Sequence, residues 1–200
     1  SLAPDPSLDS KIKIIFENED FIVVDKPSGL SVHPSSNEPR GTLVNWLLYH
    51  YADIRSVGES SIRPGIVHRL DKDTSGVMVI AKNQKIFLWL KKQFQTRQVT
   101  KKYLALINGS PQDENGKIEF NITRSKADPT KNTVSRLKTV GRSALTYWSV
   151  LRRYADHTLV EVTPKTGRMH QIRVHLKAMG WPVSGDRKYG SSRSDPKHLG

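Results

Sequence analysis

Apolar residues alternate with polar ones mainly at the two-residue period of β-strands. Two β-branched-rich runs, residues 12–16 and 21–24, flank the polar turn 17–20 and predict a β-hairpin. The continuous apolar run 77–81 predicts a buried strand. Further strands are expected at 99–107, 117–123, 144–154, 158–163 and 181–183. The turn signal at 113–116 leads us to expect that the strand 117–123 pairs with the strand before it.

Three segments have apolar residues at helical spacing. They are residues 42–51 with Thr42 as the N-cap, residues 83–96, and residues 169–179, which Gly180 ends. The expected buried faces consist of Leu43, Trp46 and Leu47 in the first helix, Ile86, Phe87, Leu90 and Phe94 in the second, and Ile172, Leu176 and Met179 in the third.

Strands outnumber helices, which favours an α+β fold with a largely antiparallel or mixed sheet. A chain of 200 residues is long enough for one domain with a substantial core. Residues 1–10 lack periodicity and are interpreted as a tail or the remnant of a linker. We therefore expect one domain over residues 11–200.

The charge of the chain points to a polyanionic partner. There are 32 Lys and Arg residues against 19 Asp and Glu residues, a net charge of +13. Residues 82–102 hold seven basic residues and no acidic one, and residues 124–142 hold six basic residues and one acidic one. Nucleic acid is the usual partner of such a chain, and an anionic lipid surface is the alternative. The sequence has no membrane-span-length apolar run, signal peptide or cysteine.

The densest group of reactive side chains lies in residues 66–76, directly before the apolar run 77–81. Part of this segment fits a calcium loop, but Lys82 stands where that loop needs a bidentate glutamate. Asp73, Thr74 and Ser75 have a structural alternative, because such residues often close turns through their side chains. Asp71, between Arg69 and Lys72, is the candidate carboxylate nucleophile.

Four segments, in order, resemble the motifs of the RluA-type pseudouridine synthases. Residues 68–76 resemble H-R-L-D-x-x-T-S-G, and residues 27–34 resemble P-x-G-L-x-V-H-P, the part of the segment K-P-x-G-L-x-V-H-P that follows its lysine. Residues 101–105 resemble K-x-Y-x-A, and residues 167–176 resemble G-R-x-H-Q-I-R-x-H-L. The resemblance extends over about residues 11 to 190.

This resemblance implies the pseudouridine synthase fold, a long mixed and mostly antiparallel sheet with flanking helices around a central RNA-binding cleft. It implies an isomerase that acts on specific uridines of structured ribosomal or transfer RNA without a cofactor or metal. We expect a cytoplasmic protein that is a monomer. Members of the family often carry an RNA-binding S4 domain ahead of the catalytic domain and a further C-terminal strand segment, and neither is found in this sequence.

The resemblance also assigns roles to residues. Asp71 acts at the ribose as nucleophile or as base after the uridine is flipped out, Arg173 pairs with it, and Tyr103 stacks on the target base. Ile172 lines the base pocket and Arg69 enters the RNA stack. The other substrate-binding candidates are His68, Lys102, Arg168 and His170.

Simpler roles remain open for several of these residues. Arg173 suits a phosphate contact, Tyr103 a half-buried strand position, and Ile172 the core of a helix. At the level of function, a noncatalytic RNA-binding module or ribosome-assembly factor is the main alternative. A nuclease that uses Asp71 and Asp73 with Mg²⁺ is a second alternative.

Overall fold

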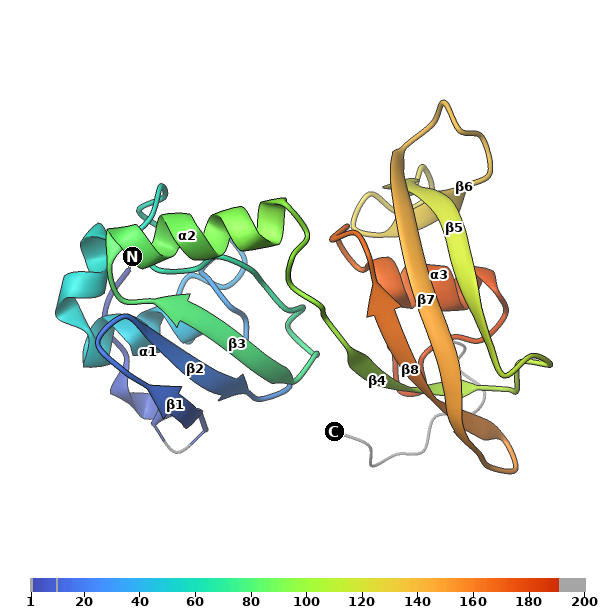
Figure 1. Ribbon diagram of the computed structural model, residues 1–200, viewed down its shortest axis with the longest axis horizontal. Coiled ribbons are helices and arrows are strands. Elements are labelled where there is room, and N and C mark those ends of the chain that lie inside the picture. The colour runs from blue at the N-terminus through green and yellow to red at the C-terminus, as the bar shows by residue number, and fades with distance from the viewer. Residues whose placement is uncertain (1, 10, 191–200) are drawn as a thin grey trace. The chain divides into compact units, whose positions relative to one another are not determined.

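A computed structural model of the chain describes residues 2–9 and 11–190 (Figure 1). The chain divides into two compact units, residues 1–98 and 99–200. None of the helices in the described residues is long and apolar enough to cross a membrane.

The first unit is built on a three-stranded antiparallel sheet with the order β1-β2-β3. Its elements are η1 (Pro6–Leu8), β1 (Lys13–Glu17), β2 (Phe21–Lys26), α1 (Leu43–His50), η2 (Ala52–Ser56), β3 (Gly76–Ala81) and α2 (Gln84–Gln95). The predicted hairpin and both predicted helices are confirmed. Thr42 is the N-cap of α1, and the Asn83 side chain caps α2 by accepting a hydrogen bond from the Ile86 amide at 3.0 Å.

The strand β3 is buried on one face only. Met78 and Ile80 are fully buried, whereas the Val77 residue is 61% exposed. The predicted strand is confirmed, but the prediction that it is buried fails at Val77. A run of apolar residues does not reveal whether a second layer covers the other face, and β3 lies at an edge of its sheet.

The second unit is a five-stranded antiparallel sheet with the order β4-β8-β7-β5-β6, against which α3 packs (Figure 1). Its elements are β4 (Tyr103–Asn108), β5 (Asn115–Arg124), β6 (Asn132–Ser135), β7 (Arg142–Arg153), β8 (His157–Pro164) and α3 (Gln171–Ala178). The predicted α+β class is confirmed. In the described residues the strands form two antiparallel sheets, one in each unit.

Strand pairing in the second unit differs from the expected hairpin. β5 pairs with β6 and β7, and β4 pairs with β8. The pairing of β4 with β8 places Ala105 opposite Val160, and both side chains belong to the buried core cluster. Long-range burial thus outweighs the local turn signal. The expected strand at 181–183 is reduced to an isolated bridge between Val183 and Ile107.

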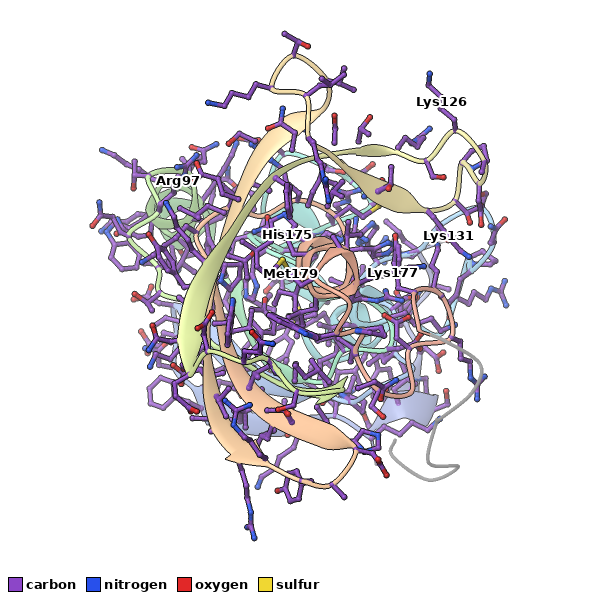
Figure 2. The ribbon with its side chains drawn as sticks, turned by 90° about the vertical axis from the view of Figure 1, so that its right-hand side faces the viewer. Arg97, Lys126, Lys131, His175, Lys177 and Met179 are labelled. Atoms are coloured by element: carbon purple, nitrogen blue, oxygen red, sulfur yellow. The ribbon has the colours of Figure 1, made fainter. Side chains whose placement is uncertain are left out.

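The helix α3 buries a wider face than expected: Leu176 is buried as predicted and Ile172 is half-buried against the same core, but Met179 is not buried. Its buried residues are Gln171, Val174, His175 and Leu176, whereas Met179 is 37% exposed. The reason is that α3 ends at Ala178, so Met179 is its C-cap and follows the buried turn. Figure 2 shows α3 end-on, with His175, Lys177 and Met179 labelled around it.

Candidate functional site

The loop that contains Asp71 begins beside the strand β3 and then leads into it. Ile66 forms a β-bridge with Ile80 in β3, and the chain enters β3 at Gly76. Gly76 has a φ of 135°, a conformation that side-chain-bearing residues rarely adopt. Between these ends the Leu70 side chain is buried. The loop is therefore fixed at both ends and at its middle, which suits a reactive side chain.

Lys26 ties this loop to the neighbouring segment. The residue is 0% exposed, and its ammonium group donates hydrogen bonds to the carbonyl oxygens of Pro27 at 2.8 Å, Leu30 at 2.8 Å and Lys72 at 3.0 Å. Burial lowers the pKa of Lys26 to about 8, although the charges of Asp73 and Asp71 act in the opposite direction. A strongly desolvated cation is thus retained next to Asp71, where it fixes the backbone.

Asp71 itself is half-buried and begins a turn in which its carbonyl oxygen accepts a hydrogen bond from the Thr74 amide at 3.1 Å. The neighbouring Lys72 forms an ion pair with Glu38 at 2.7 Å. The Ser28 hydroxyl donates to the carbonyl oxygen of Asp73 at 2.9 Å, which adds a second link between the two segments.

Two further residues of the predicted motif have distinct environments. Nε2 of His68 accepts a hydrogen bond from the Val79 amide at 3.1 Å, and its ring stacks on Phe94 with the centroids 4.6 Å apart. In the neutral ring the proton is therefore on Nδ1. Arg69 is exposed, as a residue that enters an RNA stack requires. Its predicted role, like that of His68, remains a prediction.

His33 lies within residues 27–34, one of the four segments that resemble the family motifs. Its Nδ1 atom is buried without a hydrogen-bond partner. Burial, together with the charges of Arg63 and Arg69, lowers its pKa to about 4. His33 is therefore neutral at physiological pH and shares its surroundings with two cations.

In the second unit, Tyr103 and Ile172 pack against the same core. Tyr103 is the first residue of β4 and Ile172 lies in the first turn of α3. Both are half-buried beside the cluster that contains Ile107, Val162 and Leu176. The core role suggested for Ile172 is thus confirmed. Because Ile172 and Tyr103 are only partly buried, contact of either side chain with a base remains compatible with their positions.

Arg173 has a carboxylate partner that sequence reasoning missed. Its Nε and Nη2 atoms donate to Oδ2 and Oδ1 of Asp186 at 2.7 and 2.8 Å, and its guanidinium lies 4.9 Å from the centre of the Tyr189 ring. Asp186 is in a short polar loop without periodicity, which gave no sequence signal. The pairing of Arg173 with Asp71 stays a prediction.

The remaining candidates lie around the start of α3 and along β4. His170 has a left-handed backbone with a φ of 57°, and its Nδ1 is 2.8 Å from the Tyr189 hydroxyl. Nε of Arg168 donates to the Ser143 carbonyl oxygen at 3.1 Å. Lys102 forms an ion pair with Glu161 at 3.0 Å. Their predicted RNA contacts remain predictions.

Gln171 holds the start of α3 on β7. Its amide nitrogen donates to the Leu145 carbonyl oxygen at 3.0 Å and the Thr146 hydroxyl at 2.9 Å, and its oxygen accepts from the Arg168 amide at 3.1 Å. This buried network fixes the segment that carries Arg168, His170 and Arg173, a role that the sequence did not reveal.

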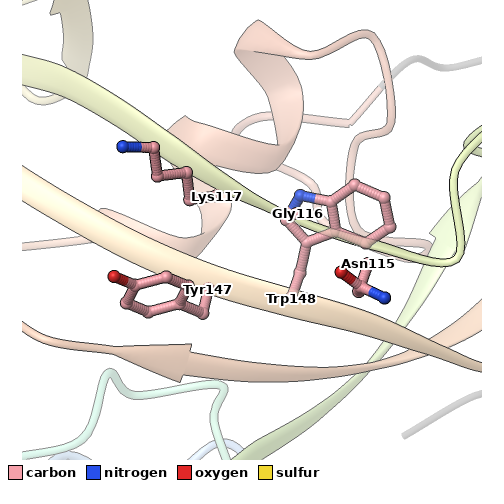
Figure 3. A pocket seen from close by; sticks show the side chains of 5 residues that line it. All are labelled: Asn115, Gly116, Lys117, Tyr147 and Trp148. Carbon is pink, nitrogen blue, oxygen red and sulfur yellow. The ribbon is translucent and has the colours of Figure 1, made fainter.

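A shallow pocket of about 300 Å³ lies elsewhere on the second unit, between β5 and β7 (Figure 3). It is lined by Asn115, Gly116, Lys117, Tyr147 and Trp148, none of which is a sequence-predicted site residue. Within the described residues there is no group of three or more His, Cys, Asp or Glu side chains that could hold a metal ion.

The sequence and the fold both have well-defined relatives. Residues 20–178 match the family model described as RNA pseudouridylate synthase. An uncharacterized RNA pseudouridine synthase from Aquifex aeolicus is 50% identical over 191 residues, which are 94% of this chain and 59% of that protein. A ribosomal large subunit pseudouridine synthase D from Borreliella burgdorferi is 43% identical over 180 residues, 90% of this chain and 55% of that protein.

A solved structure is also similar. The structure of human RNA pseudouridylate synthase domain containing 1 has a TM-score of 0.75 at 30% sequence identity. The match covers 94% of this chain and 73% of the human chain. The chain thus spans between half and two thirds of the length of the two curated relatives above.

Proposed function

This chain belongs to the RNA pseudouridylate synthase family, RluA type, and we propose that it converts uridine to pseudouridine in ribosomal RNA of the large subunit, with Asp71 acting at the ribose. The observation that carries the proposal is the Asp71 loop, which matches the family signature and is fixed by the buried Lys26. The choice of RNA is supported by the names of relatives such as the protein from Borreliella burgdorferi.

The reaction breaks the bond between N1 of uracil and C1′ of the ribose, turns the base, and forms a new bond from C5 to C1′; C5 then loses its proton and N1 gains one. No electrons are gained or lost, so the reaction needs no redox cofactor. It does need a carboxylate in a fixed position at the ribose and a site that holds the uracil base while it turns. An aspartate is ionised at neutral pH and needs no separate base to become reactive. Asp71 then attacks C1′ or removes the 2′ proton, and both routes require the same placement.

Placement of Asp71 comes from its backbone. Lys26 holds the Lys72 carbonyl group, one residue after Asp71, and Ser28 holds the Asp73 carbonyl group. A reactive group that is held before substrate binds has little conformational freedom to lose in the reaction. The half-buried position of Asp71 also limits its contact with water.

RNA binding is assigned to exposed cations. We assign to Arg69 the role of filling the gap that a flipped base leaves in the stack, and to Tyr103 that of stacking on that base; extruding the base costs a few kcal/mol. The segment between β5 and β6 adds Lys126 and Lys131, which Figure 2 labels on the second unit. We propose that these cations contact phosphates, because such contacts provide most sequence-independent affinity.

The test is tritium release from an unmodified large-subunit ribosomal RNA transcript labelled at C5 of uridine. We expect release that continues in EDTA, because no metal takes part. RNA binding without release would support the noncatalytic RNA-binding alternative. Strand cleavage that EDTA abolishes would support the nuclease with Asp71 and Asp73. Pseudouridine mapping of cellular RNA with and without the gene then identifies the target uridine.

A further inference from the structure

We propose that Asp186 is a positioning residue for the reaction, which together with Tyr189 holds the Arg173 guanidinium in the orientation needed to pair with the catalytic carboxylate. The inference rests on the proposed function, in which Asp71 is that carboxylate. It assigns a role to residues outside the four motifs found in the sequence.

The contact between Asp186 and Arg173 is two-pronged and shielded from water. Two donors of Arg173 meet the two carboxylate oxygens of Asp186 at 2.7 and 2.8 Å. The side chain of Asp186 is 4% exposed and that of Arg173 is 19% exposed. A bidentate pair fixes both the position and the plane of a guanidinium, whereas a single hydrogen bond would allow it to rotate.

The carboxylate of Asp186 is itself held in place. Its Oδ1 accepts hydrogen bonds from the amides of Lys188 at 2.9 Å and Tyr189 at 3.0 Å. Burial raises the pKa of Asp186, but Arg173 and these two amides outweigh it, so the pKa is lowered overall and the group stays ionised. Asp186 is therefore a fixed anion, and Arg173 is held by a rigid partner.

Tyr189 extends this arrangement to three parts of the second unit. Its ring lies 4.9 Å from the Arg173 guanidinium, within the range of a cation–π contact. Its hydroxyl accepts a hydrogen bond from the Asn132 amide of β6 at 2.8 Å and is 2.8 Å from Nδ1 of His170. The aromatic face and the carboxylate thus hold Arg173 from two directions.

A guanidinium has enough donors to serve two carboxylates at once. Asp186 uses the edge of the guanidinium formed by Nε and Nη2. A planar guanidinium can pair in a two-pronged way with a second carboxylate through Nη1 and Nη2, whereas a lysine ammonium lacks the planar fork that such pairing needs. A guanidinium shared in this way explains why the site uses arginine.

The alternative is that Asp186 only fastens the segment after α3 to the helix. The two possibilities differ in the pattern of rate losses. A positioning residue acts through Arg173, so its loss adds nothing once Arg173 has been altered. A purely structural residue lowers stability and acts independently of the identity of residue 173.

The experiment is a double-mutant cycle of Asp186→Asn and Arg173→Lys in the whole protein. Single-turnover tritium release, binding of the same transcript and the melting temperature are measured for the four proteins. We expect Asp186→Asn to slow the chemical step by at least about 10-fold and to weaken RNA binding by less than about 3-fold. The double variant should be no slower than Arg173→Lys alone.

Tyr189→Phe is the matched second variant, because it keeps the ring and removes only the hydroxyl. It should show a smaller loss that also disappears in the Arg173→Lys background, and it keeps the test decisive if Asp186→Asn does not fold. The inference is overturned, while the proposed function stands, by either of two results in an active enzyme. The rate losses of Asp186→Asn and Tyr189→Phe multiply with the loss of Arg173→Lys, or both variants keep the wild-type rate. An inactive wild-type protein overturns the proposed function, and the inferred role falls with it.

Discussion

Replacing Lys26 by Met should remove a component of the pH dependence of stability. The substitution keeps most of the length of the side chain and removes a buried ammonium group that donates to three carbonyl groups. Burial lowers the pKa of Lys26 from 10.5 to about 8 in the folded protein. Between these two values the unfolded chain holds a proton that the folded chain has released, so stability rises with pH.

The size of the effect follows from the two pKa values. At neutral pH both states are protonated, and the buried charge costs the folded state about 3 kcal/mol, from roughly 1.4 kcal/mol per pKa unit. At a pH of about 9.5 the folded state has lost the proton and much of this cost is relieved. The unfolding free energy should therefore gain about 2 kcal/mol from Lys26 between about pH 7 and about pH 9.5.

The assay is urea unfolding of the wild type and of Lys26→Met across this pH range, followed by tryptophan fluorescence. Only the difference in slope between the two proteins is used, because other groups titrate equally in both. Lys85→Met, which removes an exposed lysine of α2, is the matched control and should keep the wild-type slope. A Lys26→Met protein with the full wild-type rise would refute the burial of a charged Lys26.

Three further predictions concern binding, chemistry and acid stability. RNA affinity should fall steeply with salt, with a slope of log K against log salt of roughly −3.5 to −4.5 for about five phosphate contacts; a flat response in a titration series would mean that the basic segments do not bind RNA. Arg173→Lys should lower turnover by at least about 100-fold and RNA affinity by less than about tenfold, and equal losses in both would make Arg173 a phosphate contact. Burial lowers the pKa of His175 from 6.5 to about 4, so stability present above about pH 6.5 is lost as the pH falls toward 4. His175→Asn should flatten this part of an acid unfolding curve, and an unchanged curve would contradict it.

Local patterns predicted most elements of this fold. Residues 83–96 gave α2 because their apolar spacing and the Asn83 cap are local features. Pairing between distant strands was not predictable in this way. β5 pairs with β7, which follows it by many residues, because the core around Ile118 and Trp148 is completed only by that pairing.

The close approach of β5 and β7 also depends on a residue that the sequence did not mark. A Cβ atom at Gly116 would lie 3.0 Å from the Trp148 ring, so glycine allows the indole to pack against the opposite strand. Nothing in the spacing of apolar residues indicates such a contact.

The sequence predicted the motif residues of the candidate site, but not the residues that hold them in position. The signature around Asp71 is contiguous and could be found in the sequence. The supporting roles of Lys26 and Asp186 were missed, because they depend on burial and on partners that only the folded chain supplies. An isolated lysine before a proline, and an aspartate in a polar loop, ordinarily indicate exposed positions.

The central claim is that Asp71 performs the chemistry, and the most direct measurement is tritium release by Asp71→Asn on the large-subunit ribosomal RNA transcript. The amide cannot act as nucleophile or base, so we expect a folded protein with less than about 1% of the wild-type rate. Asp73→Asn, an exposed position in the same loop, is the matched control and should remain active. Release above about 1% by a correctly folded Asp71→Asn protein would contradict the assignment.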